Sequence, residues 1–128
     1  MRKQASKRQS DVLNLLHRNA KPMTAYAILD AMKQSEPNLA APTVYRTLSA
    51  LTEQGRAHKL ESMKAFVPCR CDHAVSVPVL AVCEACGIVE EHDGTPILST
   101  LSALSEQSAF RATRHIVEMH GRCQSCAA

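Results

Sequence analysis

The chain has 128 residues, of which 45% are hydrophobic and 3% aromatic, and its net charge is +3. This size fits one domain or two small ones with a packed interior, which argues against global disorder. The scarcity of aromatic residues argues against a base-stacking platform for single-stranded nucleic acid. The longest apolar run is far shorter than the roughly 20 residues of a membrane span, and no apolar signal core follows the basic N-terminus. We therefore expect a cytoplasmic protein.

The two halves of the chain carry opposite charge. Residues 1–64 contain 11 Lys and Arg against 5 Asp and Glu, whereas residues 65–128 contain 4 against 7. A basic first half suggests a polyanionic partner, and an acidic second half suggests a cation or a protein partner. Ordinary solvated charge explains these counts equally well.

Three helices are expected in the first half. Leucine and valine residues recur at helical spacing within residues 9–19 and predict the first helix. Thr24 offers an N-cap for a second helix over residues 25–33. Pro42 fits the first turn of a third helix, which Gly55 ends. The buried side of this third helix is apolar, and its other side carries Thr43, Arg46 and Thr47.

A hairpin follows these helices. Residues 56–61 and 65–68 read as two short strands around a turn that contains Lys64. Three helices followed by a basic-tipped hairpin is the order of a winged helix-turn-helix, a DNA-binding fold. The sequence therefore predicts a winged-helix DNA-binding domain over residues 1–68.

The second half is predicted to be a small α/β domain over residues 76–128, joined to the first by a hinge at 69–75. Strands are expected over 77–83, 87–91 and 110–120. A helix over 95–106 is expected to cover the sheet with a buried apolar stripe, which consists of Ile97, Leu98, Leu101 and Leu104. The overall fold class is thus α+β.

Four of the six cysteines form two CxxC pairs, Cys83 with Cys86 and Cys123 with Cys126. Two such pairs supply the four sulfurs of a tetrahedral zinc site, and a site closed in this way is structural rather than catalytic. A redox CxxC favours a cysteine at a helix N-terminus, whereas the residues after Cys86 continue as strand. A disulfide framework is disfavoured by the spacing and by the missing export signal.

Other residues of metal-ligand type gather around the hinge. Cys69, Cys71 and His73 lie in or beside it, His58 lies on the first strand of the hairpin, and further candidates follow the first CxxC pair, namely Glu90, Glu91 and His92. A site that takes ligands from the hairpin, the hinge and the second domain would tie the two domains together. Satisfied or solvated surface residues explain the same pattern about as well.

The sequence resembles the ferric uptake regulator family of metal-responsive repressors over nearly its whole length, and within that family it is most similar to the zinc-responsive branch. The resemblance rests on the third helix, Ala41-Pro42-Thr43-Val44-Tyr45-Arg46, and on the hairpin strand His58-Lys59-Leu60-Glu61-Ser62. It also rests on Thr24-Ala25-Tyr26 and on both CxxC pairs, with Gly87 after the first and His120-Gly121 before the second.

This resemblance implies a homodimer that binds palindromic operator DNA when regulatory zinc is bound and represses zinc uptake genes. It implies a winged-helix domain, a dimerisation domain, and one structural and one regulatory zinc per subunit. The regulatory ligands carried over are His58, Cys69, His73 and Glu91. The hinge is shorter than is usual in the zinc branch, which leaves Cys71 or His92 as substitutes; His115 is a further candidate ligand.

Several residues are expected to contact DNA. The guanidinium of Arg46 suits a guanine edge, and Tyr45 suits a thymine methyl or a phosphate. Thr43 and Thr47 are further candidates on the same helix, and the basic residues Arg8 and Lys59 are expected to attract phosphates. No membrane and no small organic substrate is expected.

Three other functions are weighed against this one. An iron or peroxide sensor would keep the fold and change the signal. A zinc deaminase is disfavoured because the sequence lacks a His-x-Glu motif and Cys69-Arg70-Cys71 is one residue short of the spacing required. A zinc module that binds only protein is disfavoured by the basic first half.

Overall fold

The computed structural model describes residues 2–70 and 77–127, and the chain divides into two compact units, Met1–Cys69 and Arg70–Ala128. Each unit is described by itself. The predicted hinge ligands Cys71 and His73 lie outside the described residues.

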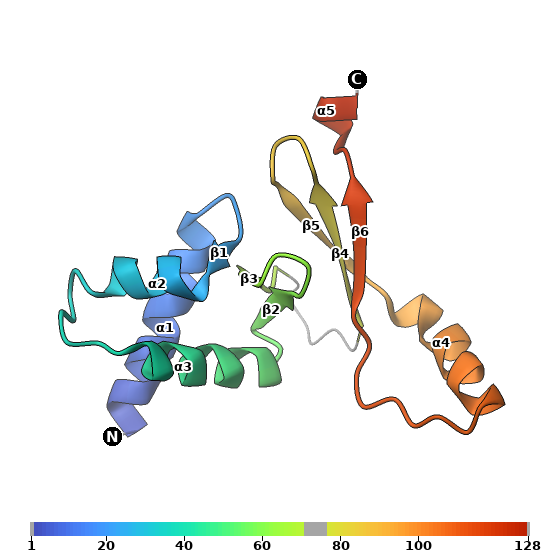
Figure 1. Ribbon diagram of the computed structural model, residues 1–128, viewed down its shortest axis with the longest axis horizontal. Helices are drawn as coiled ribbons and strands as arrows, with labels where there is room; N and C mark the ends of the chain where they lie inside the picture. Colours follow the sequence, from blue (N-terminus) through green and yellow to red (C-terminus); the bar gives the residue numbers. More distant parts are fainter. Residues whose placement is uncertain (1, 71–76, 128) are drawn as a thin grey trace. The chain divides into compact units, whose positions relative to one another are not determined.

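Three helices form most of the first unit: α1 (Arg2–Arg18), α2 (Ala25–Met32) and α3 (Ala41–Glu53). Each turns an apolar side inward, and the fully buried side chains include Leu16, Ile28 and Leu51. Thr24 caps α2, because its hydroxyl accepts a hydrogen bond from the Ala27 amide at 3.2 Å. Helices α1, α2 and α3, which are drawn in blue to green in Figure 1, therefore enclose one hydrophobic core.

A small antiparallel sheet completes the first unit. Its strands are β1 (Met23–Thr24), β2 (Ala57–Leu60) and β3 (Ala65–Pro68), in the order β1-β3-β2. The β2–β3 hairpin is the wing, and its register pairs His58 with Val67. The turn ends at Lys64, whose φ of 52° lies in the left-handed region that L-residues rarely adopt. The expected helix order and wing are present.

Two features of the first unit differ from expectation. Helix α1 begins at Arg2, seven residues before the expected start at residue 9, because a helix anchored by Val12 and Leu16 can extend through residues without apolar side chains. Strand β1 was not predicted. It has 2 residues and forms only by pairing with β3.

The second unit is built on a three-stranded sheet. Its strands are β4 (Pro78–Cys83), β5 (Val89–Asp93) and β6 (Val117–Gly121), in the order β5-β4-β6. Strand β5 pairs with β4 antiparallel, whereas β6 returns to pair with β4 in parallel, Cys83 opposite Gly121. Helices α4 (Thr95–Gln107) and α5 (Gln124–Ala127) follow β5 and β6 respectively.

The expected burial of α4 is wrong. None of the 13 residues described for this helix is buried, and Ile97 and Leu104 are 41% and 58% exposed. The predicted strand over 110–120 is also shorter, since only Val117–Gly121 is paired. The apolar stripe of α4 therefore has no partner of comparable size within the described part of the chain.

Among the described residues, no helix combines the length and the apolar character needed to cross a membrane.

Candidate metal centres and DNA-reading surface

The four cysteines of the CxxC pairs converge in the second unit. The Sγ atoms of Cys83, Cys86, Cys123 and Cys126 all lie within 4.8 Å of one another. Cys86 Sγ and Cys123 Sγ are 3.8 Å apart. Four sulfurs placed tetrahedrally at the usual zinc–sulfur bond length of about 2.3 Å are separated by about 3.8 Å along each edge. The spacing of this pair therefore fits a bound zinc ion.

The backbone explains why the sulfurs meet. The first pair lies in a tight turn in which the Gly87 amide donates to the Cys83 carbonyl at 2.9 Å, and Gly87 has a φ of 79° that favours glycine. Cys123 precedes α5, whose amides of Cys126 and Ala127 donate to the Cys123 carbonyl. The parallel β4–β6 pairing brings the two turns to one end of the sheet, and the Glu84 amide donates to the Gly121 carbonyl at 2.7 Å.

The electrostatics of the cluster favour a cation. Hydrogen bonds from the backbone amides of Cys123 and Cys86 stabilise the Cys83 thiolate and lower its pKa from 9.0 to about 6. Hydrogen bonds with the sulfurs of Cys123, Cys83 and Cys86 raise the pKa of Cys126 to about 12. The Cys126 thiol thus resists deprotonation beside the neighbouring sulfurs, and a divalent cation would supply the compensating charge. The donor set fits zinc.

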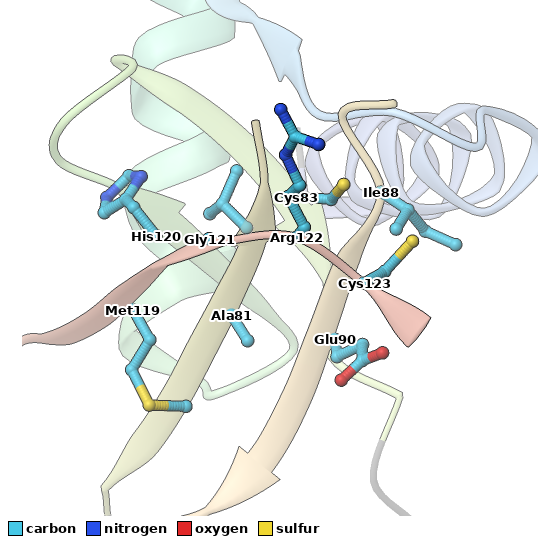
Figure 2. Close-up of a pocket in the computed structure, with 10 residues that line it drawn as sticks. Ala81, Cys83, Ile88, Glu90, Met119, His120, Gly121, Arg122 and Cys123 are labelled. Atoms are coloured by element: carbon cyan, nitrogen blue, oxygen red, sulfur yellow. The ribbon is translucent and has the colours of Figure 1, made fainter. Parts of the chain in front are cut away.

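A pocket opens beside this cluster. Its lining includes Cys83 and Cys123, together with Ala81, Glu90 and Met119, which lie in a row across the three strands (Figure 2). Its volume of about 180 Å³ is smaller than the roughly 300–1,000 Å³ of a typical small-molecule site.

Two of the predicted regulatory ligands lie on one face of the wing. The Cys69 amide donates to the Arg56 carbonyl at 2.9 Å, which extends the β2–β3 ladder by one pair. Cys69 is therefore a diagonal neighbour of His58 on the same side of the ribbon. A ring nitrogen of His58 lies within 4.8 Å of the Cys69 Sγ, and His58 is 9% exposed. An imidazole and a thiolate at this spacing suit zinc.

The other predicted ligands belong to the second unit. Glu91 lies on β5, and its Oε2 accepts a hydrogen bond from the Arg70 amide at 3.3 Å. The neighbouring candidates Glu90 and His92 lie on the opposite side of the strand and contact each other at 3.3 Å. His73 lies outside the described residues.

The predicted DNA-reading residues lie near the N-terminus of α3. Tyr45 is 49% exposed, and Arg46 is also exposed. The Arg46 Nη2 donates to the Thr43 hydroxyl at 3.3 Å. Thr47 is different, because it is 9% exposed and its hydroxyl donates to the Thr43 carbonyl at 2.9 Å. This position favours a packing role for Thr47.

The two basic residues predicted to contact phosphates both have acidic partners. Arg8 on α1 donates through Nε and Nη2 to Glu36 Oε2, at 3.3 and 3.1 Å, and both side chains are about three-quarters buried. Lys59 on the wing lies 3.6 Å from a Glu61 carboxylate oxygen and is more exposed than Arg8. The Arg8–Glu36 pair joins residues 28 positions apart, and no local sequence signal identifies it.

Comparisons with known proteins, by sequence and by structure, all match the ferric uptake regulator family or zinc uptake regulators. The sequence profile of the ferric uptake regulator family matches residues 2–120. The zinc uptake regulation protein of Escherichia coli (strain K12) is 32% identical over 117 residues, which cover 91% of this chain and 68% of that protein. A zinc uptake regulator solved with zinc and DNA superposes with a TM-score of 0.87 at 31% identity, covering 94% of this chain and 81% of the other. Holo XcZur gives a TM-score of 0.84 at 34% identity, with 94% and 84% covered.

Proposed function

The chain belongs to the ferric uptake regulator family of metal-responsive transcription regulators, which are not enzymes, and we propose that it is a zinc-responsive repressor of zinc uptake genes. In this proposal a homodimer binds palindromic operator DNA when regulatory zinc is bound. It acts in the cytoplasm, where thiols remain reduced and available as zinc ligands.

Each subunit is proposed to hold two zinc ions. The structural ion has four sulfur ligands, Cys83, Cys86, Cys123 and Cys126, and the 3.8 Å sulfur separation supports this assignment. The regulatory ion is proposed to have the ligands His58, Cys69, His73 and Glu91. The observation that carries the zinc response is the approach of an imidazole nitrogen and a thiol sulfur on the wing. This pair favours zinc over metals that prefer oxygen ligands.

DNA reading is proposed to depend on the exposed start of α3. Arg46 would contact a guanine edge through its planar fork, and Tyr45 would contact a thymine methyl or a phosphate. Thr43 and Thr47 complete the predicted set on this helix. Lys59 and Arg8 would add attraction to the phosphate backbone, reduced in each case by the acidic partner.

Dimerisation is proposed to cover the exposed apolar side of α4. Ile97, Leu101 and Leu104 lie on one side of this helix, and Phe110, which follows it, is 67% exposed. Apolar side chains arranged along one helix face in this way are typical of a protein interface. A second copy of the chain would bury them and would present two reading helices to the two half-sites of a palindrome.

The response to zinc follows from thermodynamic linkage. If regulatory zinc favours the arrangement of the two units that fits DNA, then operator binding must tighten zinc binding by the same factor. Couplings of this kind are typically worth about 1–3 kcal/mol, or roughly 5- to 150-fold in affinity.

The test is a fluorescence anisotropy titration of a labelled AT-rich palindromic duplex at fixed salt, with free zinc buffered across a wide range. We expect His58→Ala and Cys69→Ser to shift the zinc midpoint upward by more than about tenfold. His17→Ala, which removes an exposed histidine from the end of α1, is the matched control and should leave the midpoint unchanged. Unchanged zinc dependence in both wing variants would eliminate the proposed regulatory site.

The same titration with ferrous and manganous ions tests the alternative signal. Zinc should support duplex binding at the lowest free concentration. Binding supported by iron or manganese but not by zinc would establish an iron or peroxide sensor instead.

A further inference from the structure

The Arg46 side chain is tethered to its own helix. Its Nη2 donates to the Thr43 hydroxyl at 3.3 Å, one turn earlier on α3. Residues at i and i+3 lie on the same side of a helix, so the bond holds the guanidinium against the first turn of α3. From this contact we propose that Thr43 is a positioning residue, which acts on DNA recognition through Arg46. The inference rests on the proposed function, since it presumes that Arg46 reads a base.

The turn that carries Thr43 is itself held in place. The residue before the helix, Ala40, has no side chain that caps α3. Three other features fix this turn: Pro42 lies in its first residues, the Thr43 amide donates to the Ala40 carbonyl at 3.1 Å, and the Thr47 hydroxyl donates to the Thr43 carbonyl at 2.9 Å. Thr43 therefore offers its hydroxyl from a defined position.

The chemistry of the tether leaves Arg46 able to read a base. A guanidinium has five N–H donors in a planar fork, and the Thr43 hydroxyl occupies one of them. The remaining donors suffice for a bidentate contact with the O6 and N7 atoms of guanine.

The expected gain is in specificity rather than in overall affinity. An exposed arginine samples many rotamers, and fixing such a side chain on binding reduces affinity by roughly 2- to 12-fold. This loss of affinity arises only when Arg46 forms its specific contact with a base, because non-specific binding leaves the side chain free to rotate. A side chain already held by Thr43 loses less freedom, so the tether favours the correct sequence alone.

The experiment compares variants of the zinc-loaded 128-residue chain in binding selection from a randomised duplex library. Arg46→Ala identifies the base pair that Arg46 reads, as the position at which sequence preference disappears. Thr43→Val keeps the shape of the side chain and removes the hydroxyl. We expect it to reduce the preference at that base pair by about threefold to tenfold and to leave the other positions and the salt dependence unchanged. Thr43→Ser should restore the preference.

Thr52→Val is the matched control, because it makes the same chemical change near the other end of the same helix, where the Thr52 hydroxyl donates to the Ser49 carbonyl at 2.9 Å. It should leave the preference at the Arg46 base pair unchanged. The inference is overturned if Thr43→Val selects the same sequences as the unmodified chain, if it reduces the sequence preference at all positions equally, or if Thr52→Val has the same effect as Thr43→Val. If the unmodified chain enriches no sequence, the proposed function fails and this inference with it.

Discussion

Gly94 provides a test of packing in the second unit. It precedes α4, and its amide donates to the Val77 carbonyl at 2.7 Å. A Cβ atom at this position would lie 2.7 Å from the Val77 oxygen and 2.8 Å from Val79 Cγ2. Since the first of these atoms belongs to the backbone, no rotamer change removes the overlap. The φ of Gly94 is −87°, so the expected cost of Gly94→Ala is steric and not conformational.

The size of the effect follows from two opposing contributions. Overpacking a well-filled site costs about 1–3 kcal/mol. Replacing glycine by alanine also reduces the conformational entropy of the unfolded chain, which stabilises the folded state by about 0.4–1 kcal/mol. The net loss for Gly94→Ala is therefore about 1.5 kcal/mol in the free energy of opening, which corresponds to roughly tenfold faster amide exchange in β4.

Hydrogen exchange of the zinc-loaded protein, followed by mass spectrometry on peptides that cover residues 78–83, measures this opening. Gly121→Ala is the matched control, because a Cβ there has nothing within 4 Å. It should leave the exchange rate unchanged or slow it slightly. Equal protection of β4 in Gly94→Ala and the unmodified chain would refute the steric argument, as would equal destabilisation by both substitutions.

Three further predictions address other parts of the chain. In the first unit, Leu51 is 0% exposed, so Leu51→Ala should lower the free energy of unfolding by about 2–5 kcal/mol in urea titration; a loss below about 1 kcal/mol would contradict the assigned core. A double-mutant cycle of Arg8→Ala and Glu36→Ala should give a coupling of about 1 kcal/mol, because the pair is partly buried and doubly hydrogen-bonded; strict additivity would show that the ion pair contributes nothing. Leu104→Glu should shift sedimentation from dimer to monomer, while Ser99→Glu on the other side of α4 should not; a dimer that persists in Leu104→Glu would exclude this face as the interface.

The sequence predicted those parts of the fold that local patterns encode. The apolar spacing around Leu48 and Leu51 placed α3, the Thr24 cap placed the start of α2, and the doubled CxxC spacing predicted a sulfur cluster that the structure brings together. These signals are local because caps, helix faces and paired cysteines are each defined within a few residues.

The features that were missed depend on contacts between distant residues. The two-residue strand β1 exists only through its pairing with β3, and the Arg8 side chain is held by Glu36, 28 residues further along the chain. The apolar stripe of α4 was correctly identified, but its burial was wrong because the pattern reveals an apolar face and not what covers it. The ligand role of His58, Cys69, His73 and Glu91 stays a prediction.

The parallel pairing of β4 with β6 has a consequence for how the protein is made. The turn at Cys83 is synthesised long before the turn at Cys123, with the whole of β5 and α4 between them. On the ribosome, a nascent chain that ends before Val117 has only half of the sulfur cluster and lacks β6, one edge of the sheet. The second unit must therefore fold late, and we expect an interrupted chain to expose the thiols of the first CxxC pair without the second pair that would complete the metal site.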